Sequence, residues 1–193
     1  MSGRTRFAQD LIPGFRPEND LERAVARDPA LIEGLSWGEP RKGHPEGPVG
    51  AHVAELLSML EEWEEPEPRR SELRLIAIVH DSFKYQVDDG APKTGENHHA
   101  MRARRFAERY TDDERLLAAT ELHDRPYALW RRLRRTGHLD EHALTSMLRR
   151  VPDPALLLRF VELDGSSAGK NPDPVRWFRA ELERRGVVPA ARK

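Results

Sequence analysis

The stretch LRLIAIVHDSFK, residues 73–84, decides the fold class of this chain. Written on a helix, its first seven residues are apolar on most sides, and such a helix belongs at the centre of a domain. The polar residues His80 and Asp81 follow at once. We therefore expect a buried central helix whose end carries a histidine and an aspartate into the interior.

The rest of the chain also favours helices. Apolar residues recur with helical spacing, and no window alternates as a strand would. Segments rich in glycine and proline separate the helical windows. We predict helices over residues 18–35 (one or two, around Asp28-Pro29), 49–64, 72–83 (capped by Ser71), 98–110, 112–123 (capped by Thr111), 128–135, 140–150, 154–164 and 174–185. The prediction is an all-α, single-domain helical bundle of about seven to nine helices.

The composition excludes several classes of protein. A length of 193 residues suits one domain, so we treat residues 1–193 as a single unit. There is no cysteine, which rules out disulfides, thiolate metal sites and thiol nucleophiles. The 32 basic and 33 acidic residues nearly cancel. This balance argues against nucleic acid as a partner, although a basic patch such as Arg131–Arg135 stays compatible with it.

No stretch of the sequence predicts an association with a membrane. The first ten residues, MSGRTRFAQD, contain no apolar run of signal-peptide length. No segment approaches the roughly 18–20 apolar residues of a membrane span. We therefore expect a soluble, cytoplasmic protein.

Histidine and aspartate residues mark the ends of the predicted helices. His52 lies on the helix after a Gly/Pro-rich loop, His80-Asp81 ends the central helix, and Asp164 ends the penultimate one. An unpaired buried carboxylate or imidazole is costly, and a shared cation is one remedy. This nitrogen and oxygen donor set suits Mn, Fe, Co, Ni or Zn and leaves positions open for water.

The order of these residues resembles the HD-domain superfamily of metal-dependent phosphohydrolases. HPEGPVGAH, residues 44–52, is similar to the entry to the first metal-binding histidine of that family, and LRLIAIVHDSFK is similar to its apolar helix ending in HD-x-G-K. Phe83 replaces the usual glycine, while Lys84 keeps the basic position. The resemblance covers about residues 40–165, with the segments 1–39 and 166–193 expected to pack on this core.

The resemblance also implies a second metal position. In dinuclear members two further histidines join the set, and the dyad aspartate bridges the ions. Here they would be His99 and His123, with Asp81 as the bridge. We prefer His99 to its neighbour His98 because the small residues Ala103 and Ala107 follow it on the same helix face. The implied cofactor is one or two divalent transition-metal ions.

The resemblance implies hydrolysis of a phosphorylated small molecule, most often nucleotide-like, by a metal-activated water. Asp81 and Lys84 would be catalytic, and Lys84, Arg102 and Arg125 would bind the substrate. An HD-type diiron oxygenase uses the same six ligands and is the alternative function. A non-catalytic module that binds a metal or a nucleotide is the third.

Each proposed ligand also has a purely structural interpretation. His80-Asp81 could be a hydrogen-bonded pair at a helix end, and His52 a satisfied buried histidine. Asp164 could end a helix before a C′ glycine, Gly165. His123-Asp124 could cap the turn before Pro126. His44 is interpreted as a loop residue.

Overall fold

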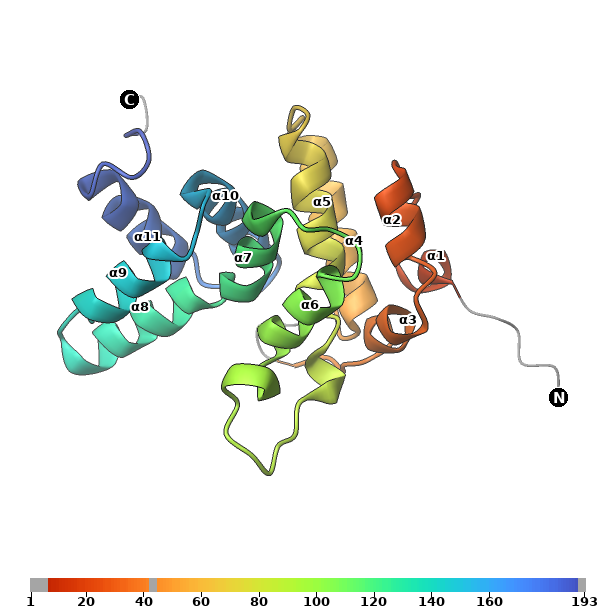
Figure 1. Cartoon of the computed structure of the whole chain (residues 1–193), viewed down its shortest axis with the longest axis horizontal. Coiled ribbons are helices and arrows are strands. Elements are labelled where there is room, and N and C mark those ends of the chain that lie inside the picture. The colour runs from red at the N-terminus through yellow and green to blue at the C-terminus, as the bar shows by residue number, and fades with distance from the viewer. Residues whose placement is uncertain (1–6, 42–44, 191–193) are drawn as a thin grey trace, which may run out of the picture.

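The central helix α5 (Arg69–Val79) organises the fold. Residues Glu72 to Val79 are all buried, and α5 contacts α4 (Val49–Glu62), α7 (Glu114–Leu122) and α10 (Pro154–Gly165). Figure 1 shows α5 near the middle of the molecule, with α1–α3 on one side and α7–α11 on the other. The predicted buried central helix is confirmed.

The structure is a computed structural model that describes residues 7–41 and 45–190, and these contain helices and no strand. The remaining elements are α1 (Ala8–Leu11), α2 (Asp20–Val25), α3 (Pro29–Leu35), η1 (Lys84–Gln86), η2 (Gly95–Asn97), α6 (His99–Ala107), α8 (Arg125–Thr136), α9 (Glu141–Arg149) and α11 (Asp173–Arg184). Eight helices have nine or more residues, α4 to α11, in agreement with the predicted all-α bundle.

Two predicted helix caps are wrong, because each helix begins elsewhere. α5 begins at Arg69, directly after Pro68, and the backbone N–H of Ser71 donates to Glu67 within the first turn. α7 begins at Glu114, and its cap is Asp113, whose side chain accepts from the backbone N–H of Arg115. Proline and aspartate at these positions start a helix better than the more distant hydroxyls.

Two apolar clusters share the helices α7 and α10. The larger cluster gathers residues of α1 to α7, and the smaller one gathers residues of α8, α9 and α11 together with Leu122 of α7. α10 supplies both, with Leu156 and Phe160 in the first and Leu157 and Val161 in the second. The C-terminal helices are thus tied to the core through α7 and α10, and Asp164 is the last residue but one of α10.

One glycine allows the N-terminal helices to reach the end of α5. A Cβ built on Gly34 of α3 would lie 1.6 Å from the backbone oxygen of Ser82. The backbone of α3 therefore touches the turn that follows Asp81, which only a glycine permits. This contact places α3 directly against the residue that follows the His-Asp dyad.

None of the helices among the described residues is long and apolar enough to cross a membrane.

Candidate metal centre

Three helices bring the first group of candidate ligands together. His52 comes from α4, His80 and Asp81 follow α5, and Asp164 lies at the end of α10. Nε2 of His52 is 3.0 Å from Oδ1 of Asp164, and Nε2 of His80 is 3.8 Å from the same oxygen. Nε2 of His80 lies 3.5 Å from Oδ2 of Asp81. The four side chains predicted for the first metal position thus lie together.

The histidine rings are held so that Nε2 faces inward. Nδ1 of His80 is 3.0 Å from the carbonyl oxygen of Ala77, three residues earlier on the helix. Nδ1 of His52 lies 3.4 Å from a carboxylate oxygen of Glu46. In His80, an Nδ1–H that donates to the carbonyl leaves the Nε2 lone pair available, which is the usual arrangement of a metal-binding histidine.

One atom in this group requires an explanation. Nε2 of His80 is fully buried and has no hydrogen-bond partner among the described residues. Buried polar atoms are rarely left unsatisfied, and a bound ion or water is one explanation for an exception. Ligands about 2.1 Å from one ion lie about 3.0 Å apart at right angles and about 4.2 Å apart across it. The separations of 3.0–3.8 Å fit that range.

A second group lies on the other side of Asp81. Its Oδ1 is 3.3 Å from Nε2 of His99 and 3.7 Å from Nε2 of His123. Nδ1 of His123 lies 2.8 Å from the carbonyl oxygen of Thr120, so this ring is held in the same way as that of His80. One Asp81 oxygen faces each group, and both groups have the spacing needed to hold a metal ion. This is the placement that a bridging carboxylate requires.

The structure separates the two neighbouring histidines. His99 approaches Asp81, whereas Nε2 of His98 lies 3.3 Å from Oδ2 of Asp124, and Nδ1 of His98 accepts from the N–H of Ala100. The placement of His99 agrees with its preference over His98. His98 instead caps the N-terminus of α6 and lies stacked against His99, with 4.6 Å between the ring centroids.

The sequence analysis missed Asp124 as part of the centre. Its carboxylate makes no cap hydrogen bond to α8; it lies 3.3 Å from His98 and 4.0 Å from His99. These three side chains form a further group with the spacing of metal ligands. A second His-Asp dipeptide, at residues 123–124, was the available signal. Asp124 therefore contacts His98 and His99 and supports their orientation.

The alternative interpretation of Asp164, as a helix-end residue before a C′ glycine, does not hold in the structure. Gly165 is not a C′ glycine, because α10 includes it and Ser166 occupies the C-cap. A Cβ on Gly165 would lie 2.3 Å from a methyl group of Val175, so this glycine permits close packing with α11. Asp164 itself faces His52 and His80.

Electrostatics keep the donors in the states that bind metals. Burial lowers the pKa of His80 to about 3, so its imidazole is neutral. Burial acts to raise the pKa of Asp81, but the charge of Lys84 and contacts with three histidines hold it well below the usual range. Burial also acts to raise the pKa of Asp164, but the charge of Lys170 and the hydrogen bond with His52 hold it well below the usual range. At neutral pH both carboxylates are ionised.

In the second group the two histidines shift in opposite directions. Burial lowers the pKa of His99. Burial acts in the same direction on His123, but its contact with Asp81 and the charge of Asp124 outweigh it and raise that pKa. Burial would raise the pKa of Asp124, yet the hydrogen bond from His98 and the neighbouring histidines lower it to about 2.

The predicted substrate-binding cations fall into three different places. Lys84 forms an ion pair with Oδ2 of Asp81, and Lys170 lies 2.6 Å from Oδ1 of Asp164. Arg102 lines a cavity beside α6, whereas Arg125 is exposed and lines a separate cavity between α8 and α9. Of the three predicted residues, only Lys84 contacts a candidate metal ligand.

A narrow cavity opens onto the first group. Its volume is about 10 Å³, which is close to the room for one water molecule. The residues that line it are Trp37, Arg41, Glu46, Gly47, Val49, His52, Asp81 and Lys84. The Arg41 guanidinium lies over the Trp37 ring, 5.7 Å from its centre. His44, the first residue of the HPEG motif, lies outside the described residues.

The departure from the motif at Phe83 does not disturb the dyad. Phe83 has a φ of −113°, so the turn needs no glycine, and its ring packs 4.7 Å from that of Phe106 on α6. The phenylalanine thus attaches the turn after Asp81 to the helix that begins with His99.

Compared with models of protein families, with curated proteins and with solved structures, the chain matches none of them. The structure establishes the fold class and a group of possible metal ligands, without a family. It is a helical protein with a buried cluster of histidines and aspartates that could hold metal ions: His52, His80, Asp81, His99 and His123.

Proposed function

We propose that the protein is a metal-dependent phosphohydrolase that acts on a phosphorylated small molecule. The observation that carries the proposal is the position of Asp81. Its two oxygens face two separate groups of histidines, and Lys84 lies against the same carboxylate. The expected partner is a nucleotide-like phosphoester, in keeping with the HD resemblance.

The candidate ligands divide into two sets. His52, His80, Asp81 and Asp164 would hold one ion, and Asp81, His99 and His123 would hold the other. A divalent ion at such a site lowers the pKa of a bound water and neutralises charge on a phosphoryl group. Asp81 is ionised at neutral pH, and in this proposal it would hold the ions and orient the attacking water.

Cations around the cluster favour a phosphorylated substrate. Lys84 and Lys170 contact the two carboxylates of the first group, and Arg41 lines the adjoining cavity with Lys84. A phosphoester brings charge that these groups would offset. Lys84 is the best placed of them, because it contacts Asp81 and also faces the cavity.

The experiment that tests the proposal is a hydrolysis panel with defined metals. The chelated chain is reloaded with Mn, Fe, Co, Ni or Zn and offered p-nitrophenyl phosphate, bis(p-nitrophenyl) phosphate and nucleoside mono-, di- and triphosphates. Phosphate release is measured in ¹⁸O-labelled water, since attack by water places the label in one product.

Matched variants make the result specific. Asp81→Asn should abolish turnover, and Lys84→Ala should raise KM about 10–100-fold while the metal content is retained. Lys93→Ala is the control, because Lys93 is an exposed loop lysine paired with Asp89. Oxygen consumption by the iron form without phosphate release would favour the diiron oxygenase. Metal binding without either reaction would favour a binding module.

A further inference from the structure

A cavity of about 330 Å³ lies beside the turn that follows Asp81. Phe83 lines it from that turn, Gln86 from η1, Ala30 from α3 and Glu96 from η2. The others are Arg102, Arg105 and Phe106 of α6 and Arg109, which follows that helix. This volume lies in the range of small-ligand sites, about 300–1,000 Å³. It is much larger than the cavity at the first metal group.

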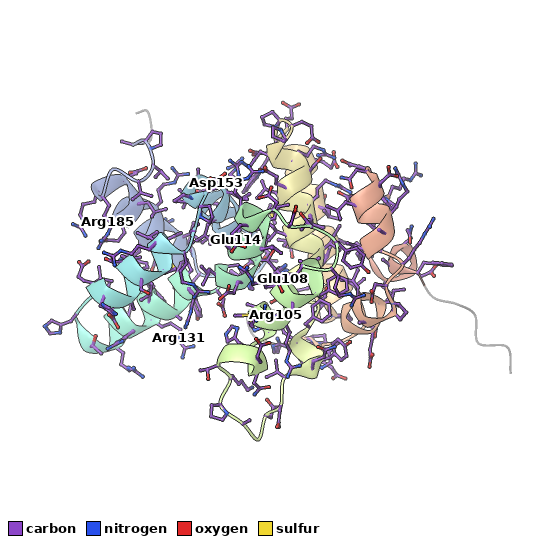
Figure 2. All side chains as sticks on the ribbon, viewed as in Figure 1. Arg105, Glu108, Glu114, Arg131, Asp153 and Arg185 are labelled. Carbon is purple, nitrogen blue, oxygen red and sulfur yellow. The ribbon has the colours of Figure 1, made fainter. Side chains whose placement is uncertain are left out.

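The three arginines that line this cavity differ in their partners. Arg105 pairs with Glu96 at 2.9 Å and Glu108 at 3.0 Å, and Figure 2 shows Arg105 and Glu108 side by side on α6. Arg109 pairs with Asp28. The charges of these two guanidinium groups are therefore already offset.

Arg102 has no such partner in the part of the chain that the structure describes. Its one hydrogen bond is a long one, 3.4 Å, to the side-chain oxygen of Asn97. Its Nε atom is buried and has no acceptor. Because a guanidinium offers five N–H donors, Arg102 retains donors and a full charge for an anionic ligand.

The cavity is connected to the candidate metal centre by short stretches of chain. Arg102 follows His99 by three residues on α6, so the two side chains share a helix face about one turn apart. Phe83 follows Asp81 by two residues and packs against Phe106. Among the described residues, no candidate metal ligand lines this cavity, so a ligand bound at the metal groups would have to extend past the dyad turn to reach Arg102.

We propose that Arg102 binds a second phosphate group of the substrate, separate from the phosphoester at the metal centre. This inference rests on the proposed function and names its substrate class, a small molecule phosphorylated at two positions. The phosphate oxygens would accept hydrogen bonds from the terminal nitrogens of Arg102, whose hydrogen bond to Asn97 is long. Gln86, exposed at the rim, offers a neutral donor to the same group.

The test compares two probes that differ by one phosphate. Adenosine 5′-monophosphate and adenosine 3′,5′-bisphosphate are titrated into the full chain by calorimetry, with and without added Mn. We expect the bisphosphate to bind at least about tenfold more tightly. Arg102→Gln should abolish that difference without changing affinity for the monophosphate. Arg176→Gln, the same charge change on the exposed face of α11, should preserve it.

The outcomes separate this inference from the proposed function. Calorimetry needs no turnover, so a preference that Arg102→Gln removes supports the second phosphate site even if neither probe is hydrolysed. Equal binding of both probes, no binding of either, or an Arg102→Gln chain that keeps the preference overturns it. If both probes are hydrolysed with the same KM, the proposed phosphohydrolase function stands and the second phosphate site is rejected. Circular dichroism of each variant confirms that the fold is intact.

Discussion

Asp81→Asn is the sharpest perturbation of the candidate metal centre. Asparagine keeps the shape of the side chain and one carbonyl oxygen but removes the charge. The first group would retain three donors, His52, His80 and Asp164, while the second would retain only His99 and His123. A single substitution should therefore weaken both positions, because Asp81 belongs to both groups.

The magnitude follows from the known effect of residues that support metal ligands. Residues that merely support a ligand change metal affinity about 10–100-fold when mutated, so loss of a charged ligand should cost at least about 100-fold at each position. The wild-type chain should bind two ions per chain, and Asp81→Asn should bind neither at micromolar metal. His123→Gln is the matched variant: it touches only the second group and should leave one ion per chain.

The assay is elemental analysis of chains that have been chelated, incubated with Mn or Zn and desalted. Far-UV circular dichroism checks that each variant is folded, and His123→Gln gives a second measurement if Asp81→Asn is unstable. Two ions retained by Asp81→Asn, or both lost from His123→Gln, would refute the bridging arrangement. A wild-type chain that takes up none of Mn, Fe, Co, Ni or Zn would refute the metal centre itself.

Three further predictions test residues around the centre. Asp124→Asn should reduce metal affinity about 10–100-fold at the position of His99 only, measured by competition with a chelator; unchanged affinity would contradict its supporting role. Gly34→Ala should destabilise the chain by about 1–3 kcal/mol, because the new methyl group clashes with the backbone of Ser82; an unchanged melting temperature would reject that contact. Burial acts to raise the pKa of Asp28, but hydrogen bonds from a tyrosine, a backbone N–H and an arginine lower it. The stabilisation by the Asp28 carboxylate is therefore present above the usual pKa of 3.8 and is lost as the pH falls through the lower folded value. In chemical denaturation, the free energy of unfolding of Asp28→Asn should be below that of wild type at pH 7, and the two values should converge in acid.

The sequence predicted those parts of the centre that depend on local pattern. The apolar stretch before His80 and Asp81 placed both residues at the end of a buried helix, and the small residues after His99 distinguished it from His98. In both cases the side chain's surroundings follow from helix periodicity, which can be read along a single segment.

Features that depend on contacts between distant segments were not predictable in this way. Arg102, Arg105 and Arg109 look alike in the sequence, yet only Arg102 lacks a carboxylate partner among the described residues, because Glu96 and Asp28 approach the other two from separate elements. Arg125 was a candidate because it follows His123-Asp124, but α8 directs it toward α9 and a different cavity. Asp124 was interpreted as a cap because its approach to His98 depends on how α6 packs against α7.

The lysines of the centre link metal binding to substrate binding. Lys84 and Lys170 each pair with a carboxylate of the first group, Asp81 and Asp164, and so supply the positive charge that an ion would otherwise supply. A divalent ion on the same carboxylates would offset their charge and weaken both ion pairs. The ammonium groups would then be available to the phosphate oxygens of a substrate at the adjoining cavity, which Lys84 already lines. Metal and phosphoester should therefore bind cooperatively, and Lys84→Ala should reduce that cooperativity while the ion itself binds at least as tightly as in wild type.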